Sequence, residues 1–136
     1  MSDYTMNVTL DQPHDETVAA VREALTGQGF GVLTEIDVRA TMKAKLDVDV
    51  PAQIILGACR PELAHKALSA APSLGALLPC NVVVRTAADG RTVVEAIDPD
   101  AMARLEASPA VREVATEARD RLSAALDTLR LTHVEA

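Results

Sequence analysis

The sequence predicts a single α+β domain: a mainly antiparallel sheet of about five strands with helices packed on one face. Two observations predict this class. Short segments rich in β-branched residues are separated by few, unevenly placed helical segments, whereas a parallel sheet needs regular alternation. Two of these segments flank Asp89-Gly90, a dipeptide typical of tight hairpins. The chain has 136 residues and no linker-like stretch, so we expect one domain over residues 1–136.

The N-terminal half contains two predicted strands and two predicted helices. Residues 4–10 alternate loosely between apolar and polar side chains, which is typical of a strand. A helix follows, with Asp15 as its candidate N-cap and Gly27 near its end. Residues 30–36 form the second predicted strand. Asp37 can then cap a short helix that has an apolar residue at every fourth position.

The C-terminal half contains three further predicted strands and three further helices. Residues 53–59 are an apolar run too short for a free helix, and they suit a buried strand. Pro61 stands where proline is favoured at the start of a helix. Two prolines and a glycine within residues 72–80 predict a packed loop. The remaining predicted elements are strands at 81–86 and 92–97, a helical segment from Pro99 and a long amphipathic helix over 109–130.

The register of the predicted hairpin brings polar residues to one end of the sheet. A two-residue loop at Asp89-Gly90 places Asn81 opposite Asp98, with Cys80 one residue beyond. If strand 53–59 runs antiparallel beside strand 81–86, its last residue reaches the same end. The residues expected there are Cys59, Cys80, Asn81 and Asp98, with Met102 about one turn into the next helix.

The two cysteines, Cys59 and Cys80, admit two interpretations. In a reducing compartment they can act as soft metal ligands or as a redox pair. They can equally be small buried hydrophobic residues, because free cysteine is among the most buried residue types. The 20 residues between them do not form a CxxC motif. His65, on the helix after Cys59, is either a third metal ligand or a histidine on the polar edge of that helix.

The polar and acidic residues near the predicted strand ends also have two explanations. Asn81 and Asp98 could bind a polar ligand together, but Asp98 before Pro99 is also typical of a helix start. Glu35 and Asp37 share a strand face, as paired carboxylates in acid–base or metal sites do. Asp37 is better explained as the cap of the following helix.

Composition excludes several functions. The net charge is -7, and 13 basic residues are scattered among 20 acids, whereas a nucleic-acid surface needs clustered Lys and Arg. Tyr4 and Phe30 are the only aromatic residues, so base stacking lacks platforms. No apolar run approaches the roughly 20 residues that span a bilayer, and the N-terminus lacks a secretory pattern. We therefore expect a cytoplasmic protein with reduced cysteines and with no nucleic-acid or membrane partner.

Three segments of the chain carry a family resemblance: GFGVLTEIDVRATMKAKLDVDV (29–50), ILGACRPELAHKAL (55–68) and LGALLPCNVVVR (74–85). They resemble a widespread prokaryotic family known as domain-of-unknown-function family 302. The resemblance implies a curved antiparallel sheet with a β-α-β4-α core, in the TATA-binding-protein-like class, and association as a homodimer. It implies no established activity. The characteristic positions of the family fall here on Gly31, Glu35, Asp37, Gly57, Cys59, Pro61, Ala64, His65, Pro79, Cys80 and Asn81.

Three hypotheses about function follow. The first is a homodimeric module that binds a small ligand, a metal or a cofactor near Cys59 and Cys80, with zinc or copper(I) as candidate metals. The second is a thiol-based redox or sulfur-transfer enzyme, whose thiol pKa the helix start at Pro61 could lower. The third is a structural or interaction protein with inert cysteines and an interface at Leu77 and Leu78.

The candidate residues are therefore few, and none forms a recognised catalytic motif. The chain has no nucleophile elbow, P-loop, dinucleotide fingerprint or zinc signature. The candidate ligand-binding residues are Cys59, Cys80, Asn81 and Asp98. The candidate metal ligands are Cys59, Cys80 and His65.

Overall fold

Strands and helices alternate along the chain and assemble into one sheet with a helical layer. The computed structural model describes residues 2–132. In chain order its elements are β1 (Thr5–Leu10), α1 (His14–Gly27), β2 (Gly31–Asp37), α2 (Val38–Leu46), β3 (Gln53–Cys59), α3 (Pro61–Ala70), the 3₁₀ helix η1 (Pro72–Leu77), β4 (Cys80–Thr86), β5 (Thr92–Ile97), α4 (Asp100–Leu105) and α5 (Pro109–Thr132). None of these described helices is both long and apolar enough to cross a membrane.

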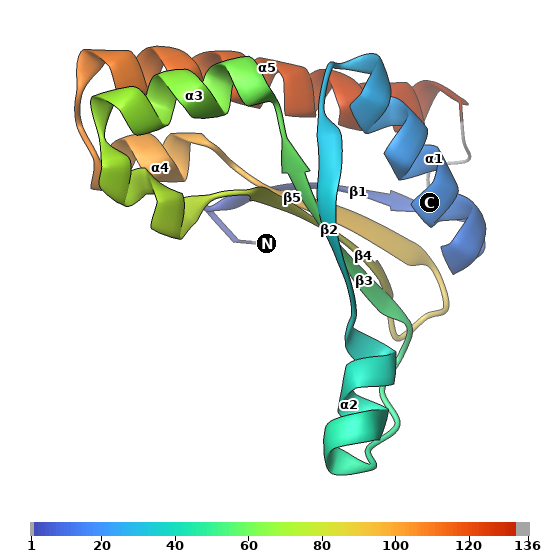
Figure 1. Ribbon diagram of the computed structural model, residues 1–136. Coiled ribbons are helices and arrows are strands. Elements are labelled where there is room, and N and C mark those ends of the chain that lie inside the picture. Colours follow the sequence, from blue (N-terminus) through green and yellow to red (C-terminus); the bar gives the residue numbers. More distant parts are fainter. Residues whose placement is uncertain (1, 133–136) are drawn as a thin grey trace.

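The predicted fold class is confirmed. The five strands form one open antiparallel sheet in the order β1-β5-β4-β3-β2, and α1 and α5 lie across one of its faces (Figure 1). The short helix predicted after Asp37 is α2. The Asp37 carboxylate accepts a hydrogen bond of 2.9 Å from the backbone N–H of Ala40, so Asp37 is the N-cap, as predicted.

Two local predictions were wrong. The predicted loop over residues 72–80 contains the helix η1, because Pro72 is tolerated at the start of a helical turn and buried Leu74 anchors that turn. Helix α1 starts at His14, before the predicted cap, because the Pro13 carbonyl accepts hydrogen bonds from both the backbone N–H and the hydroxyl of Thr17. Asp15 therefore lies within the first turn.

The main core lies between the sheet and helices α1 and α5. Strand residues alternate between the two faces of a sheet, and in β4 and β5 every second residue is buried on the helical side. Each large aliphatic side chain buried there contributes about 1.5–3 kcal/mol to stability. The largest members of this core are Phe30, Val8, Leu10, Val21, Leu25, Leu56, Val82, Val84, Val94, Leu122, Leu126 and Leu129.

A second, smaller core lies among α3, η1, α4 and the first half of α5. Its buried members are Leu63, Ala67, Ala71, Leu74, Met102, Val111, Val114 and Ala118. Helix α5 contributes to both cores, because its apolar residues recur every three or four positions along its length. The two cores therefore meet along the middle of α5.

The β4–β5 hairpin has a different register from the predicted one. Ala87 donates its backbone N–H to the Arg91 carbonyl at 2.8 Å, and Thr86 pairs with Thr92, so the loop has three residues instead of two. Gly90 takes a φ of 86°, and the Asp89 carboxylate accepts hydrogen bonds from the N–H and guanidinium of Arg91, which stabilises this longer loop.

The longer loop changes what lies across from Asn81. Val82 pairs with Ala96, so Asn81 comes next to Ile97 and not, as predicted, opposite Asp98. Successive residues of a strand point to opposite faces of the sheet. Asn81 accordingly lies on the face that carries no helix, whereas Cys80 and Val82 are buried towards the helices.

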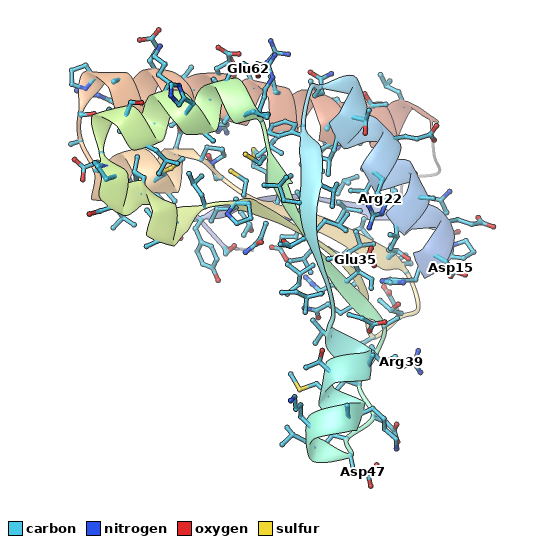
Figure 2. The ribbon with its side chains drawn as sticks, in the orientation of Figure 1. Asp15, Arg22, Glu35, Arg39, Asp47 and Glu62 are labelled. Atoms are coloured by element: carbon cyan, nitrogen blue, oxygen red, sulfur yellow. The ribbon has the colours of Figure 1, made fainter. Side chains whose placement is uncertain are left out.

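Strands β2 and β3 carry α2 away from the body of the domain as an extended arm, residues 31–59 (Figures 1 and 2). No residue of α2 is buried. Exposed large apolar side chains gather on the arm: Leu33, Ile36, Leu46 and Val48. The sheet face opposite the helices is also partly apolar, with Ile55, Val83, Val93 and Ile97 only half-buried. Within residues 2–132, no element packs over the outer part of the arm or over this face of the sheet.

We predict that Gly57→Ala destabilises the fold. A Cβ at Gly57 would collide with the Thr34 hydroxyl and would lie 2.8 Å from Cγ of Pro79. Such overpacking typically costs about 1–3 kcal/mol. Gly27→Ala is the matched control, because a Cβ there meets nothing within 4 Å and alanine favours the helix. Urea unfolding of both variants checks this; equal stability of the two would contradict the close packing at Gly57.

Candidate functional site

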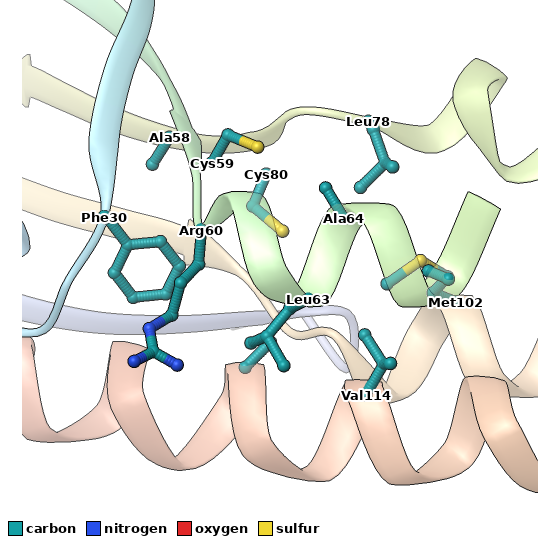
Figure 3. A pocket seen from close by; sticks show the side chains of 12 residues that line it. Phe30, Ala58, Cys59, Arg60, Leu63, Ala64, Leu78, Cys80, Met102 and Val114 are labelled. Carbon is teal, nitrogen blue, oxygen red and sulfur yellow. The ribbon is translucent and has the colours of Figure 1, made fainter. Parts of the chain in front are cut away.

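A partly open cavity lies where the two cores meet. Its volume is about 30 Å³, and its walls come from the ends of β3 and β4 and from α3, α4 and α5 (Figure 3). Its lining residues are Phe30, Ala58, Cys59, Arg60, Leu63, Ala64, Ala67, Leu78, Cys80, Met102, Val114 and Ala118. Four of these are alanines, and such short side chains do not fill the space between the surrounding helices and strands. The cavity is thus apolar, apart from three sulfur-containing side chains and one arginine.

Cys59 and Cys80 reach this cavity from neighbouring strands. Cys59 ends β3, where it pairs with Gly31 of β2, and Cys80 begins β4, where it pairs with Ala58. Both are free thiols; Cys80 is buried and Cys59 is partly exposed. Met102 of α4 lines the same cavity and is 7% exposed. The structure therefore gathers three of the residues that the sequence placed at this end of the sheet.

The other predicted site residues lie elsewhere. His65 is on the exposed side of α3 and does not line the cavity. Asn81 lines a groove of about 330 Å³ on the uncovered face of the sheet, together with Thr5 and Glu95. The strand itself explains this separation, because Cys80 and Asn81 are consecutive residues of β4 and so point to opposite faces of the sheet.

Asp98 and Glu35 have structural partners. The Asp98 carboxylate accepts a hydrogen bond of 3.0 Å from the backbone N–H of Asp100, the first residue of α4. The same carboxylate lies 3.2 Å from the guanidinium of Arg119 on α5. Asp98 thus holds the start of α4 against α5, which agrees with its interpretation as a cap. Glu35 pairs with Arg22 of α1 and not with Asp37.

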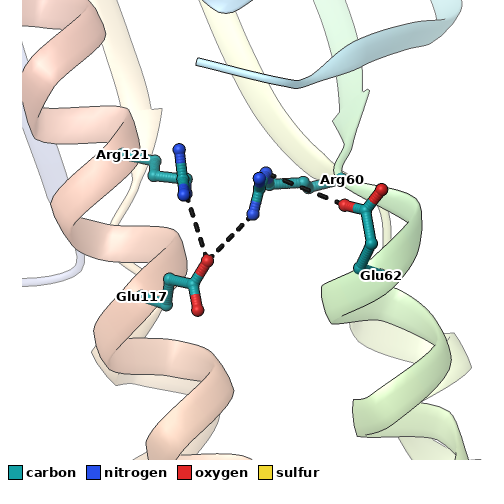
Figure 4. A network of polar contacts seen from close by, with 4 residues as sticks. All are labelled: Arg60, Glu62, Glu117 and Arg121. Carbon is teal, nitrogen blue, oxygen red and sulfur yellow. Dashed lines mark hydrogen bonds and ion pairs between the residues drawn. The ribbon is translucent and has the colours of Figure 1, made fainter.

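Arg60 is a residue of this site that the sequence analysis missed. Its guanidinium lines the cavity, and its Nη1 lies 2.8 Å from Glu117, which also accepts a bond of 3.1 Å from Arg121 (Figure 4). A weaker ion pair of 3.8 Å joins it to Glu62. Its side chain is only 19% exposed, and its Nε is buried without a hydrogen-bond acceptor. Arg60 thus connects the start of α3 to α5.

The position of the Arg60 side chain also explains why residue 29 is a glycine. Gly29 has a φ of 82°, which side chains disfavour, and a Cβ there would lie 2.8 Å from the Arg60 Nε. The sequence showed Arg60 only as the residue before Pro61, and it showed Glu117 only as a helix partner of Arg121. The contact between Arg60 and Glu117 spans 57 positions of sequence, so no local pattern reports it.

Comparison with known proteins supports the resemblance found in the sequence. The family model for the domain of unknown function DUF302 matches residues 6–129. The chain belongs to the DUF302 family. No curated protein matches it. The crystal structure of an uncharacterized conserved DUF302 protein from Bacillus stearothermophilus is similar, with 29% identity and a TM-score of 0.84 over 93% of this chain and 98% of that one.

The cavity of this DUF302 protein keeps both thiols protonated at neutral pH. Burial, and to a smaller extent the neighbouring Cys59, raises the pKa of the Cys80 thiol to about 11. Burial and then the negative charge of Glu62 also raise the pKa of Cys59. A catalytic cysteine needs the opposite shift, since the thiolate is the nucleophile. The start of α3 at Pro61 therefore does not activate Cys59 in the way that the enzyme hypothesis requires.

The donor groups near the cysteines are unusual for a zinc protein. Within residues 2–132, no group of three or more His, Cys, Asp and Glu side chains is placed to hold a metal ion. A structural zinc site needs four such ligands. The cavity offers sulfur atoms instead, two from thiols and one from a thioether, which suit softer ions.

We predict that the Cys80 thiol makes the stability of this DUF302 protein fall at alkaline pH. The pKa of an unfolded thiol is about 9, whereas burial raises the pKa of the folded Cys80 thiol to about 11. The stabilisation is therefore complete below the unfolded pKa and is lost as the pH rises towards 11. This amounts to about 2–3 kcal/mol.

Urea unfolding at several pH values between about 7 and 11 checks this against the Cys80→Ala variant. The variant is less stable at every pH because it leaves a hole, but its stability should fall less steeply. Parallel pH curves for the two proteins would contradict a buried, protonated Cys80.

Proposed function

We propose that this protein is a homodimeric binding module that takes a small ligand or a metal ion into the cavity at Cys59 and Cys80. The observation that carries the proposal is that two cysteines from different strands, and the sulfur of Met102, line one cavity. Inert core cysteines require only burial, whereas these three residues share a space that other side chains leave unfilled. The raised thiol pKa values argue against a cysteine nucleophile at neutral pH, and a metal ion that binds here must displace the thiol protons.

The size of the cavity supports a ligand of few atoms. A cavity needs about 10–15 Å³ to admit one water molecule, so a volume of about 30 Å³ accepts one ion or a very small molecule. An organic cofactor would have to separate the two cores. Because both cysteines are free thiols, the site suits a reducing compartment, and we propose the cytoplasm.

Binding is tested on the full chain, purified without added metal and kept reduced. Zinc, cadmium, silver(I), copper(I) and xenon are titrated separately, and native mass spectrometry and thermal shift report saturable binding. We expect a one-to-one complex that Cys59→Ser and Cys80→Ser each weaken by about 100-fold. A cysteine that holds the ligand cannot be replaced by a hydroxyl, which is a poor donor to soft ions.

His65→Ala is the matched control, because His65 is exposed and lies outside the cavity. It should bind like the wild type. Failure of all five probes to bind, or binding that survives both serine substitutions, would overturn the proposed function and leave the cysteines as packing residues.

The homodimer is supported by surfaces that one chain leaves uncovered. A helix of nine residues is marginal in water unless it packs against something, yet α2 has no buried residue. Leu46, the last residue of α2, is 66% exposed, and Ile36 of the preceding strand is 48% exposed. We propose that the arm of one copy lies against the half-buried Val83 and Ile97 on the uncovered sheet face of the other, which would bury both apolar surfaces.

We predict that Leu46→Asp converts the dimer into a monomer, because it would bury an unpaired carboxylate in the interface. Sedimentation velocity over a series of protein concentrations measures this. Leu131→Asp is the control, since Leu131 is 86% exposed at the end of α5 and lies outside the arm. A wild type that stays monomeric at every concentration would refute the dimer, as would an unchanged Leu46→Asp variant.

A further inference from the structure

We infer that Met102 is a third metal ligand and that the site binds a monovalent soft cation, copper(I) or silver(I), through the sulfur atoms of Cys59, Cys80 and Met102. This inference rests on the proposed function and names the ligand. It gives α4, predicted from the sequence only as a helical segment that brings Met102 to this end of the sheet, a direct role in binding.

The position of Met102 is the first support. Helix α4 has six residues, and Met102 is its only buried residue. That single buried side chain enters the same cavity as the two cysteines (Figure 3). Asp98 holds the start of α4 through the Asp100 N–H and through Arg119 on α5. The fold thus anchors α4 so that its one inward side chain faces the thiols.

The chemistry of the donors is the second support. A thioether is a soft, uncharged donor that copper(I) and silver(I) accept, whereas zinc favours thiolate, imidazole and carboxylate ligands in groups of four. Two thiols and one thioether leave a tetrahedral zinc site incomplete. Within the part of the chain that the structure describes, no cluster of three or more His, Cys, Asp and Glu side chains supplies the missing ligands.

The charge balance is the third support. Each cysteine releases its thiol proton to solvent when it binds the cation, so two thiolates and one monovalent cation carry a net charge of -1. A buried charge needs a partner. Arg60 lines the same cavity, and its buried Nε has no hydrogen-bond acceptor. Arg60 is the one positively charged residue among the described residues that line the cavity, so it is the candidate to offset this charge, with Glu117 and Glu62 holding its guanidinium in place.

Met102→Leu tests the inference, because leucine keeps the apolar volume and removes the thioether. Affinities are measured by competition with a chromophoric copper(I) chelator, and for cadmium by isothermal titration. We expect the variant to bind copper(I) and silver(I) about tenfold more weakly, with little change for cadmium. Met42→Leu, on the arm and outside the cavity, is the matched control and should match the wild type.

A spectroscopic measurement keeps the test independent of variant folding. In protein whose methionines are replaced by selenomethionine, the copper X-ray absorption spectrum should contain a copper–selenium distance. That distance should disappear in Met102→Leu and persist in Met42→Leu. The wild-type measurement alone decides the matter if Met102→Leu fails to fold.

The possible failures are distinguishable. If no soft cation binds, or if binding survives Cys59→Ser and Cys80→Ser, both the proposed function and this inference fall. If a cation binds through the cysteines but no copper–selenium distance appears and Met102→Leu binds normally, only the role of Met102 is refuted. If cadmium or zinc binds more tightly than copper(I) and silver(I), the preference for a monovalent cation is wrong.

Discussion

The packing of α5 against two cores at once is the constraint on which the rest of the structure depends. Its second half covers the sheet through Leu122 and Leu126, and its first half covers α3 and α4 through Val111 and Val114. The side chains of a single helix pack less closely at the point where it passes from one core to the other. That place is Ala118, and the cavity lies there. The candidate site is therefore a consequence of how the fold divides its core.

The fold class and most element positions could be predicted because their signals are local. Asp37 caps α2, Pro61 starts α3, and apolar spacing marks α5, and each feature depends on neighbours within a few residues. The hairpin at Asp89-Gly90 was predicted for the same reason. Its loop length was not, because a two-residue and a three-residue loop can share this dipeptide. The choice depends on the hydrogen bonds that Asp89 makes to Arg91.

The candidate site was only partly predictable, because it depends on which sheet face each side chain occupies and on contacts across the chain. Asn81 and Cys80 are consecutive in β4, so they point to opposite faces of the sheet even though they lie at the same end of it. The supposed antiparallel pairing of β3 with β4 is confirmed, and it places Cys59 near Cys80. Arg60 left no signal at all, since its partner Glu117 lies on a helix that the sequence connects to it only through the tertiary fold.

Strands β2 and β3 connect the two surfaces to which we assign functions. At one end of this pair Gly31 lies opposite Cys59, and at the other end Asp37 lies opposite Ile54 at the base of the arm. The ladder between them is irregular at Leu33, where the register shifts. A second copy that held the arm would restrain the far end of β3, and a cation at Cys59 would restrain the near end. Because β3 carries both restraints, dimer formation would already remove part of the conformational entropy that cation binding costs, and the reverse also holds. The two events would therefore favour each other.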